Sequence, residues 1–90
     1  MVNVKIPTVL RKYTDEQAVV TTSEGTLADV LDAIEASHTG FREQIIAPEG
    51  GLHRFINVYV NDEDVRFLEG LDTKITADDT VSLLPAVAGG

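Results

Sequence analysis

The residues with the clearest chemical potential are the last five, Ala86-Val87-Ala88-Gly89-Gly90. They carry no side-chain charge, and the two glycines lack a Cβ, so the segment is slim. Beyond Pro85, where we expect the last strand to end, five extended residues span at most about 17 Å, enough to enter another protein's active site. The free α-carboxylate of Gly90 would then be the reactive group. A terminal pair of glycines also arises by chance, and a frayed end needs no function.

This carboxylate needs activation before it can react. Transfer of AMP from ATP to Gly90 would give an acyl-adenylate that a sulfur nucleophile can displace. The product is a thiocarboxylate, whose sulfur is a nucleophile at neutral pH and can be delivered to another molecule. The chain has no cysteine to carry sulfur instead and no ATP-binding motif, so we expect the activating enzyme to be a partner.

The other polar and glycine clusters lack the spacing that catalysis or metal binding needs. Gly50-Gly51 is not followed by the lysine and hydroxyl residue of a phosphate loop, and His38 and His53 have no second ligand at helical spacing. The acidic run 62–64 lacks the glycine and terminal glutamate of a calcium loop, and no G-x-S-x-G motif occurs. We interpret them as loops, a helix end and a solvated turn, and expect no metal site.

Length and composition narrow the class of protein. Ninety residues form one small domain with a thin core, which weighs against a large active-site cavity and hence against an enzyme. A formal charge of -8 disfavours nucleic acid and anionic membranes as partners and favours a basic protein surface, although many acidic proteins are merely soluble. No apolar run approaches the roughly 18 residues of a membrane span, and the N-terminus does not resemble a signal peptide, so we expect a cytoplasmic location.

Short strands around one helix must position the tail. The alternation of apolar residues predicts strands over 2–7, 18–22, 55–60 and 80–84, a brief strand over 65–67 and a polar turn over 11–16. Thr26 predicts a helix N-cap, with Asp29 completing an acidic variant of the capping box, and the helix should run from about 27 to 37. A short helical turn over 41–46 follows.

This order predicts an α+β fold of the β-grasp type, because one amphipathic helix can cover only one face of a single mixed sheet. We expect residues 1–85 to form the domain and 86–90 a flexible tail. If Ile56, Val58 and Val60 face the helix, Phe55, Tyr59 and Leu84 face outward and form an apolar docking patch. Alternatively, the register is shifted by one residue or the loop over 41–52 covers them.

The sequence resembles the ThiS/MoaD family of ubiquitin-like sulfur carrier proteins over nearly its whole length. The segments that carry this resemblance are Val4 to Thr8, Leu52 to Phe67 and Leu83 to Gly90. The terminal glycine pair after a proline is shared across the family. The stretch Asn57 to Arg66 indicates the branch that serves cysteine biosynthesis.

The resemblance implies that a ubiquitin-activating-type adenylyltransferase adenylates and thiocarboxylates Gly90, with Gly89 beside it. The carrier would then dock on a pyridoxal-phosphate cysteine synthase, and a zinc-dependent JAMM-type metallopeptidase would release the cysteine formed on Gly90. ATP, pyridoxal phosphate and zinc would belong to these partners and not to this chain. The residues expected to contact the partners are Phe55, Tyr59, Leu84, Pro85, Ala86, Val87 and Ala88.

Other functions fit the same residues. The small subunit of molybdopterin synthase uses a similar tail on a different enzyme, a ubiquitin-like modifier would join Gly90 to target lysines, and an adaptor would bind through the sheet face with an inert tail. One departure from the family is the turn Ala77-Asp78-Asp79, where many members have Asp-Gly-Asp. This departure affects only the geometry of that turn, because Asp tolerates the left-handed conformation better than most residues.

Overall fold

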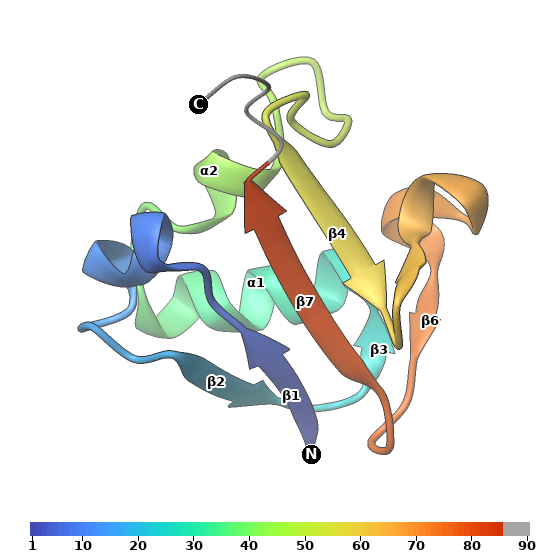
Figure 1. Ribbon diagram of the computed structural model, residues 1–90, viewed down its shortest axis with the longest axis horizontal. Helices are drawn as coiled ribbons and strands as arrows, with labels where there is room; N and C mark the ends of the chain where they lie inside the picture. Colours follow the sequence, from blue (N-terminus) through green and yellow to red (C-terminus); the bar gives the residue numbers. More distant parts are fainter. Residues whose placement is uncertain (86–90) are drawn as a thin grey trace.

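The computed structural model describes residues 1–85, and the predicted tail, 86–90, lies outside them. The chain forms a mixed sheet with one main helix packed across it, which confirms the predicted β-grasp fold (Figure 1). In order across the sheet, its strands are β2 (Val19–Thr22), β1 (Val2–Lys5), β7 (Thr80–Pro85), β4 (Ile56–Val60) and β5 (Glu63–Asp64). Strands β1 and β7 are parallel, and the other neighbouring pairs are antiparallel.

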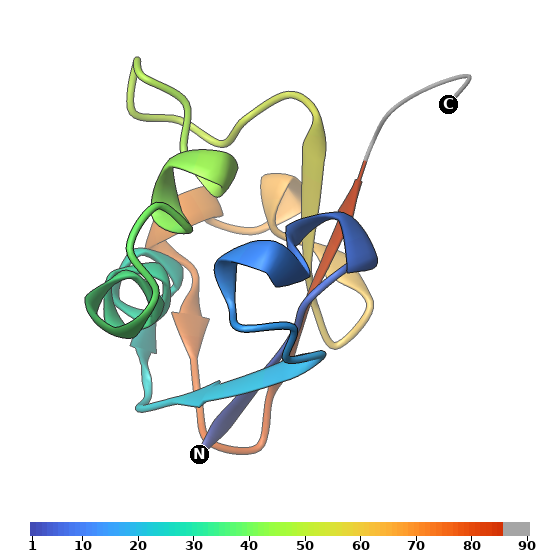
Figure 2. The ribbon, with the colours of Figure 1, turned by 90° about the vertical axis from the view of Figure 1, so that its left-hand side faces the viewer.

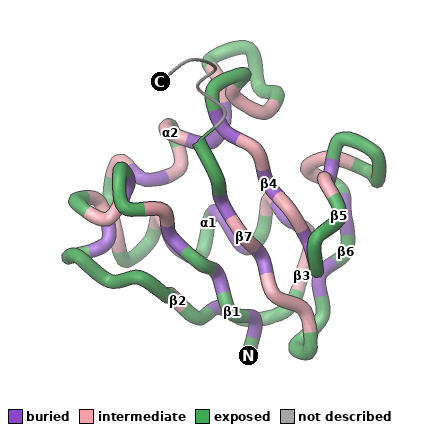
Figure 3. Tube along the Cα trace, viewed as in Figure 1, coloured by how far each residue is buried: buried purple, intermediate pink, exposed green. Residues whose placement is uncertain are grey.

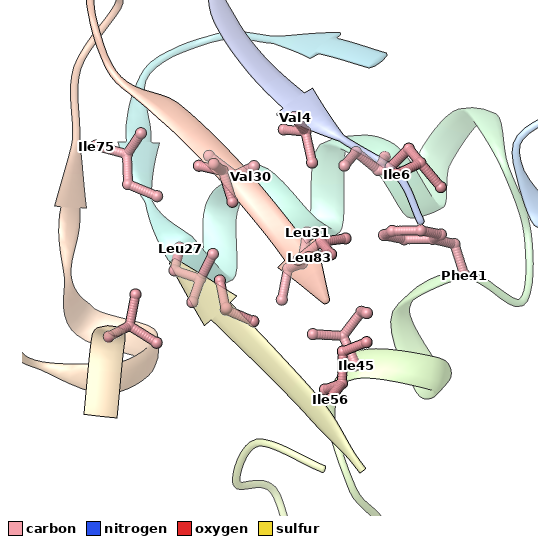
Figure 4. Close-up of a cluster of buried hydrophobic side chains, with 14 of the residues drawn as sticks. Val4, Ile6, Leu27, Val30, Leu31, Phe41, Ile45, Ile56, Ile75 and Leu83 are labelled. Atoms are coloured by element: carbon pink, nitrogen blue, oxygen red, sulfur yellow. The ribbon is translucent and has the colours of Figure 1, made fainter. Parts of the chain in front are cut away.

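Helix α1 (Leu27–Ser37) forms the second layer (Figure 2). Its buried stripe packs on the inner faces of β1, β4 and β7, and Phe41 from the following segment closes one end of the core beside Ile6 and Ile45 (Figure 4). The buried residues of the stripe are Leu27, Val30, Leu31 and Ile34. Burying these apolar side chains is the main stabilising term of a small domain.

The start of α1 follows the sequence prediction. The Asp29 N–H donates to Thr26 Oγ1 at 3.2 Å, and the Thr26 N–H donates to Asp29 Oδ2 at 3.1 Å, which completes the capping box. Gly25 precedes this cap, and a Cβ added to it would lie 2.8 Å from the Asp29 Cβ. The predicted helical turn over 41–46 is also present, as α2 (Arg42–Ile45).

One expected element is only partly confirmed, because 14–16 form a turn but 11–13 do not, and a second is wrong. The segment expected as a polar turn over 11–16 begins as a 3-10 helix, η1 (Thr8–Tyr13), which buries Leu10. The strand expected over 65–67 is also a 3-10 turn, η2 (Val65–Phe67), and the return strand is β5, just before it. This turn forms because Asp64 Oδ1 accepts the Arg66 N–H at 2.8 Å. A side chain thus caps the turn, and β5 does not continue its backbone pairing with β4.

A second small ribbon has no clear signal in the sequence. Strands β3 (Gly25–Thr26) and β6 (Lys74–Ile75) pair antiparallel, and η3 (Gly70–Asp72) lies just before β6. The Leu27 N–H donates to the Thr73 carbonyl at 2.9 Å, which ties the beginning of α1 to this ribbon. Two-residue strands are too short for an alternating pattern, so tertiary contact alone defines them.

Candidate functional site

The last described residues of the chain lie at one end of the sheet, beside the beginning of β4. Pro85 pairs with Ile56 and Leu84 with Asn57, so β7 leaves the sheet next to Phe55 (Figure 1). This end also holds the loop that follows α2. Any segment that continues from Pro85 therefore starts beside the residues predicted to dock.

The predicted outward residues do face away from the helix. Buried and half-buried positions alternate along β4 and over the first four residues of β7 (Figure 3). This is the pattern of strands with one face packed on α1, as the sequence register requires. Leu84 is 49% exposed and Phe55 56% exposed, while Tyr59 is half-buried beside Ser82 on the same face. The segment over 41–52 does not cover Phe55 and Leu84, which stay exposed, because its large apolar residues are buried in the core; these are Phe41, Ile45 and Ile46.

An open groove of about 670 Å³ crosses this outer face between η1 and strands β7 and β4. Its lining includes the apolar residues Pro7, Val9, Tyr59, Leu84 and Pro85. Val9 is also exposed, so apolar surface from η1 adjoins that from the strands. We call this surface, together with Phe55, the docking face, because exposed apolar residues grouped at a concave site mark protein contact surfaces.

The charges of the groove differ from those of the whole chain. Lys5 and Arg11 line it together with one carboxylate, that of Asp62. The Arg11 Nε–H donates to the Ile6 carbonyl at 3.1 Å, so this cation is fixed in place. The chain's excess of carboxylates thus lies outside the groove lining, so the lining itself does not support the prediction that acidic charge favours a basic partner surface.

Arg66, which sequence reasoning did not single out as a site residue, lies beside the docking face. Its guanidinium donates to the Asn57 Oδ1 at 2.9 Å and to the carbonyls of Ile56 and His53 at 3.0 and 3.1 Å. These partners lie 9 to 13 positions away in the chain. No local pattern could have indicated this contact.

Two carboxylates act as structural caps. Glu35 accepts the N–H groups of Gly40 at 2.9 Å and Arg42 at 2.7 Å, and these backbone bonds lower its pKa. Asp79 accepts the Thr76 N–H at 2.8 Å and the Asn61 side-chain amide at 2.7 Å, which also lowers its pKa. Glu35 thus connects α1 to the beginning of α2.

The two acidic turns, over 61–64 and 76–79, have ordinary turn geometry. Asn61 and Asp62 adopt positive φ angles of 51° and 75°, and they form the two-residue connection between β4 and β5. Asp78 has no positive φ, so the Asp in place of the family's glycine is unstrained and Asp79 closes the turn. Among residues 1–85, no three His, Asp or Glu side chains are grouped where they could hold a metal ion.

The fold and the docking face define a ubiquitin-like β-grasp protein with an apolar surface at the root of its C-terminal segment. A comparison with protein families also covers the residues beyond Pro85. The chain belongs to the ThiS family, whose profile matches residues 4–90. No helix within residues 1–85 is long and apolar enough to cross a membrane.

Three relatives show where the chain lies within this group. It is 52% identical over 91 residues to the sulfur carrier protein CysO of Mycobacterium tuberculosis, covering 99% of this chain and 98% of that protein. The crystal structure of M. tuberculosis CysO matches with a TM-score of 0.92 at 49% identity, over 97% of this chain and all of that one. A chain of the Amycolatopsis orientalis BexX/CysO complex matches with a TM-score of 0.93 at 47% identity, over the full length of both chains.

The remaining relative is not a CysO protein. It is small archaeal modifier protein 3 of Haloferax volcanii, which is 36% identical over 67 residues that cover 74% of this chain and 72% of that protein. The resemblance predicted from the sequence is therefore confirmed. The homology with CysO supports a sulfur carrier.

Proposed function

We propose that this protein carries sulfur for cysteine biosynthesis as a thiocarboxylate on Gly90. An adenylyltransferase of the ubiquitin-activating type would transfer AMP from ATP to the Gly90 carboxylate and release pyrophosphate. A sulfide donor would then displace AMP and leave the thiocarboxylate. The protein itself would be a substrate of these steps and not an enzyme.

The observation that carries the proposal is the position of the docking face. Exposed Phe55 and Leu84 lie at the point where β7 ends, so an enzyme that binds them also meets the root of the segment leading to Gly90. That enzyme gains specificity from a rigid sheet, while the slim residues Ala86, Val87, Ala88 and Gly89 thread its active site. The 52% identity with a protein named sulfur carrier supports the assignment of the cargo.

The same surface would serve the later partners. On a pyridoxal-phosphate cysteine synthase, the thiocarboxylate sulfur would attack an aminoacrylate, and an acyl shift would leave cysteine linked to Gly90. A zinc-dependent JAMM-type metallopeptidase would hydrolyse this amide and regenerate the carboxylate. ATP, pyridoxal phosphate and zinc would be held by the partners, and such chemistry would take place in the cytoplasm.

The test is intact mass spectrometry after incubation with ATP, magnesium, a sulfide donor and the organism's adenylyltransferase. We expect one oxygen to be replaced by sulfur and the change to map to Gly90. Deletion of Gly90 should abolish it, whereas Gly51→Ala, a matched glycine change in an exposed loop, should not. An unmodified wild-type chain, beside a control carrier that is modified, would contradict the proposal.

A second candidate function is protein modification through an isopeptide bond to Gly90. The similarity to a small archaeal modifier protein favours it. Mass spectrometry of lysine adducts in cells separates the two functions, because a carrier yields a thiocarboxylate and a modifier yields branched peptides. The molybdopterin synthase subunit would differ from the cysteine carrier only in the enzyme that consumes the sulfur.

A further inference from the structure

The guanidinium of Arg66 is held in one position by the beginning of β4. Its Nη1 donates to the side-chain oxygen of Asn57 at 2.9 Å, and its Nη2 donates to the carbonyls of Ile56 at 3.0 Å and His53 at 3.1 Å. The backbone N–H of Arg66 is fixed as well, because it donates to Asp64 Oδ1 at 2.8 Å. Both ends of this side chain are therefore anchored.

These acceptors need a partner because the outer edge of β4 is only partly paired. Strand β5 pairs with β4 at Tyr59 and Val60 and ends there, so it does not reach the first residues of β4. Arg66 covers that unpaired edge from η2. A planar guanidinium with several N–H donors can bind two carbonyls and an amide oxygen at once, which a lysine ammonium does less well.

The segment that Arg66 holds carries Phe55. The Ile56 N–H donates to the His53 carbonyl at 3.2 Å, which closes a turn around Arg54 and Phe55. The Phe55 N–H donates to His53 Nδ1 at 3.3 Å, and the two rings lie 5.3 Å apart. Arg66 binds the same His53 carbonyl, so it supports the residue that orients the exposed ring of Phe55.

We propose that Arg66 is a positioning residue for docking, which holds the 53–56 turn so that Phe55 is presented to the partner enzyme beside the end of β7. The docking role rests on the proposed function, whereas the effect on the turn does not. Fixing an exposed aromatic anchor in advance lowers the entropy lost when a partner binds it. Arg66 thus acts on recognition through Phe55 and not on the chemistry of Gly90.

The first experiment measures amide hydrogen exchange by NMR and needs no partner. In Arg66→Ala, the Phe55 and Ile56 amides should exchange roughly tenfold faster, because the turn loses the side-chain bonds that hold the carbonyls of His53 and Ile56. The Tyr59 amide, two residues before the Asn61 N–H that donates to Thr80, faces β7 and should stay protected. Arg66→Lys should not restore protection, since lysine keeps the positive charge but lacks the planar guanidinium with its several N–H donors. Unchanged exchange at both turn amides in Arg66→Ala would overturn the inference.

The second experiment measures adenylation kinetics with the carrier as the varied substrate. Arg66→Ala should raise KM about fivefold with little change in kcat, as expected for a misplaced anchor residue. Arg42→Ala is the matched control, because Arg42 pairs with Asp32 at 2.6 Å on the helical layer and should leave KM unchanged.

A double-mutant cycle assigns the effect to Phe55. In a Phe55→Ala background, Arg66→Ala should change KM less than twofold further, because the anchor it positions is gone. A full additional fivefold effect would show that Arg66 contacts the partner by itself and would overturn the positioning role. A wild-type chain that is not adenylated would refute the proposed function, while hydrogen exchange would still decide whether Arg66 holds the turn.

Discussion

Leu83 and Leu84 are adjacent leucines on β7 with opposite environments, and they test the register on which the docking face depends. Leu83 is 1% exposed and faces α1, opposite Val58, whereas Leu84 is 49% exposed on the outer face, opposite Asn57. Replacing each by alanine removes the same atoms. Any difference between the two variants therefore reports the two faces of the sheet.

The expected costs follow from burial. Leu83→Ala leaves a cavity in the core and should lower the free energy of unfolding by about 2–5 kcal/mol. For a domain of this size, 3 kcal/mol corresponds to a fall in Tm of roughly 12–24 °C. Leu84→Ala loses only partial burial and leaves no cavity, so it should cost about 1 kcal/mol or less.

The assays are urea or thermal unfolding followed by circular dichroism, and the KM of the carrier in adenylation. Leu84→Ala should remain folded and raise KM several-fold, because a side chain central to an interface is removed. Leu83→Ala should be strongly destabilised, and at a temperature where it is still folded its KM should be near that of the wild type. Equal destabilisation by the two variants would refute the register and, with it, the docking face.

Further predictions concern docking, the helix cap and the titrating carboxylates. Phe55→Asp or Tyr59→Asp should weaken binding to the adenylyltransferase, measured by calorimetry, without loss of the native circular dichroism signal; an unfolded variant would place the side chain in the core. Gly25→Ala should lower the free energy of unfolding by about 1 kcal/mol or more, because the added Cβ would lie 2.8 Å from the Asp29 Cβ and disturb the capping box. Gly51→Ala is the control and should be nearly neutral, because a Cβ at this position would have no neighbouring atom within 4 Å. Equal urea midpoints for the two variants would contradict this prediction. Because hydrogen bonds lower the pKa of Glu35 from 4.5 and of Asp79 from 3.8, each carboxylate stabilises the fold above its ordinary pKa, and that stability is lost as pH falls through the lower pKa of the folded state. Urea unfolding between pH 7 and 3 should therefore show a smaller acid-induced loss in Glu35→Gln and Asp79→Asn than in the wild type, and an unchanged slope would show that these caps do not titrate as the geometry requires.

The parts of the fold that could be predicted from the sequence are those with local signals. Thr26 and Asp29 define the beginning of α1 because the capping box needs only residues three apart. Ile56, Val58 and Val60 fix the register of β4 because one face of a strand is buried. The outward direction of Tyr59 and Leu84 follows from that register, whereas Phe55 lies in the turn just before β4 and is oriented by that turn.

Elements held by distant contacts could not be predicted. The β3–β6 ribbon joins residues about 50 positions apart, and its two-residue strands have no periodicity of their own. The 3-10 turn at Val65 replaces the expected strand because one carboxylate, that of Asp64, captures a backbone N–H. The roles of Gly89 and Gly90 remain predictions, since these residues lie outside those the structure describes.

The end of β7 at Pro85 lies beside the docking face, and this arrangement limits how a carrier of this shape can bind its partner enzymes. An enzyme that receives Gly90 has to approach past Pro85, and Leu84 and Phe55 adjoin that approach. Under the proposed function, two enzymes would therefore compete for one face, and the carrier would have to leave the activating enzyme before it could meet the sulfur acceptor. Fast exchange favours an interface of small area and moderate affinity over a large apolar one. A groove of partly exposed apolar residues with Lys5, Arg11 and Asp62 at its sides meets that requirement, because mixed charges allow several partner surfaces to bind without making any of them permanent.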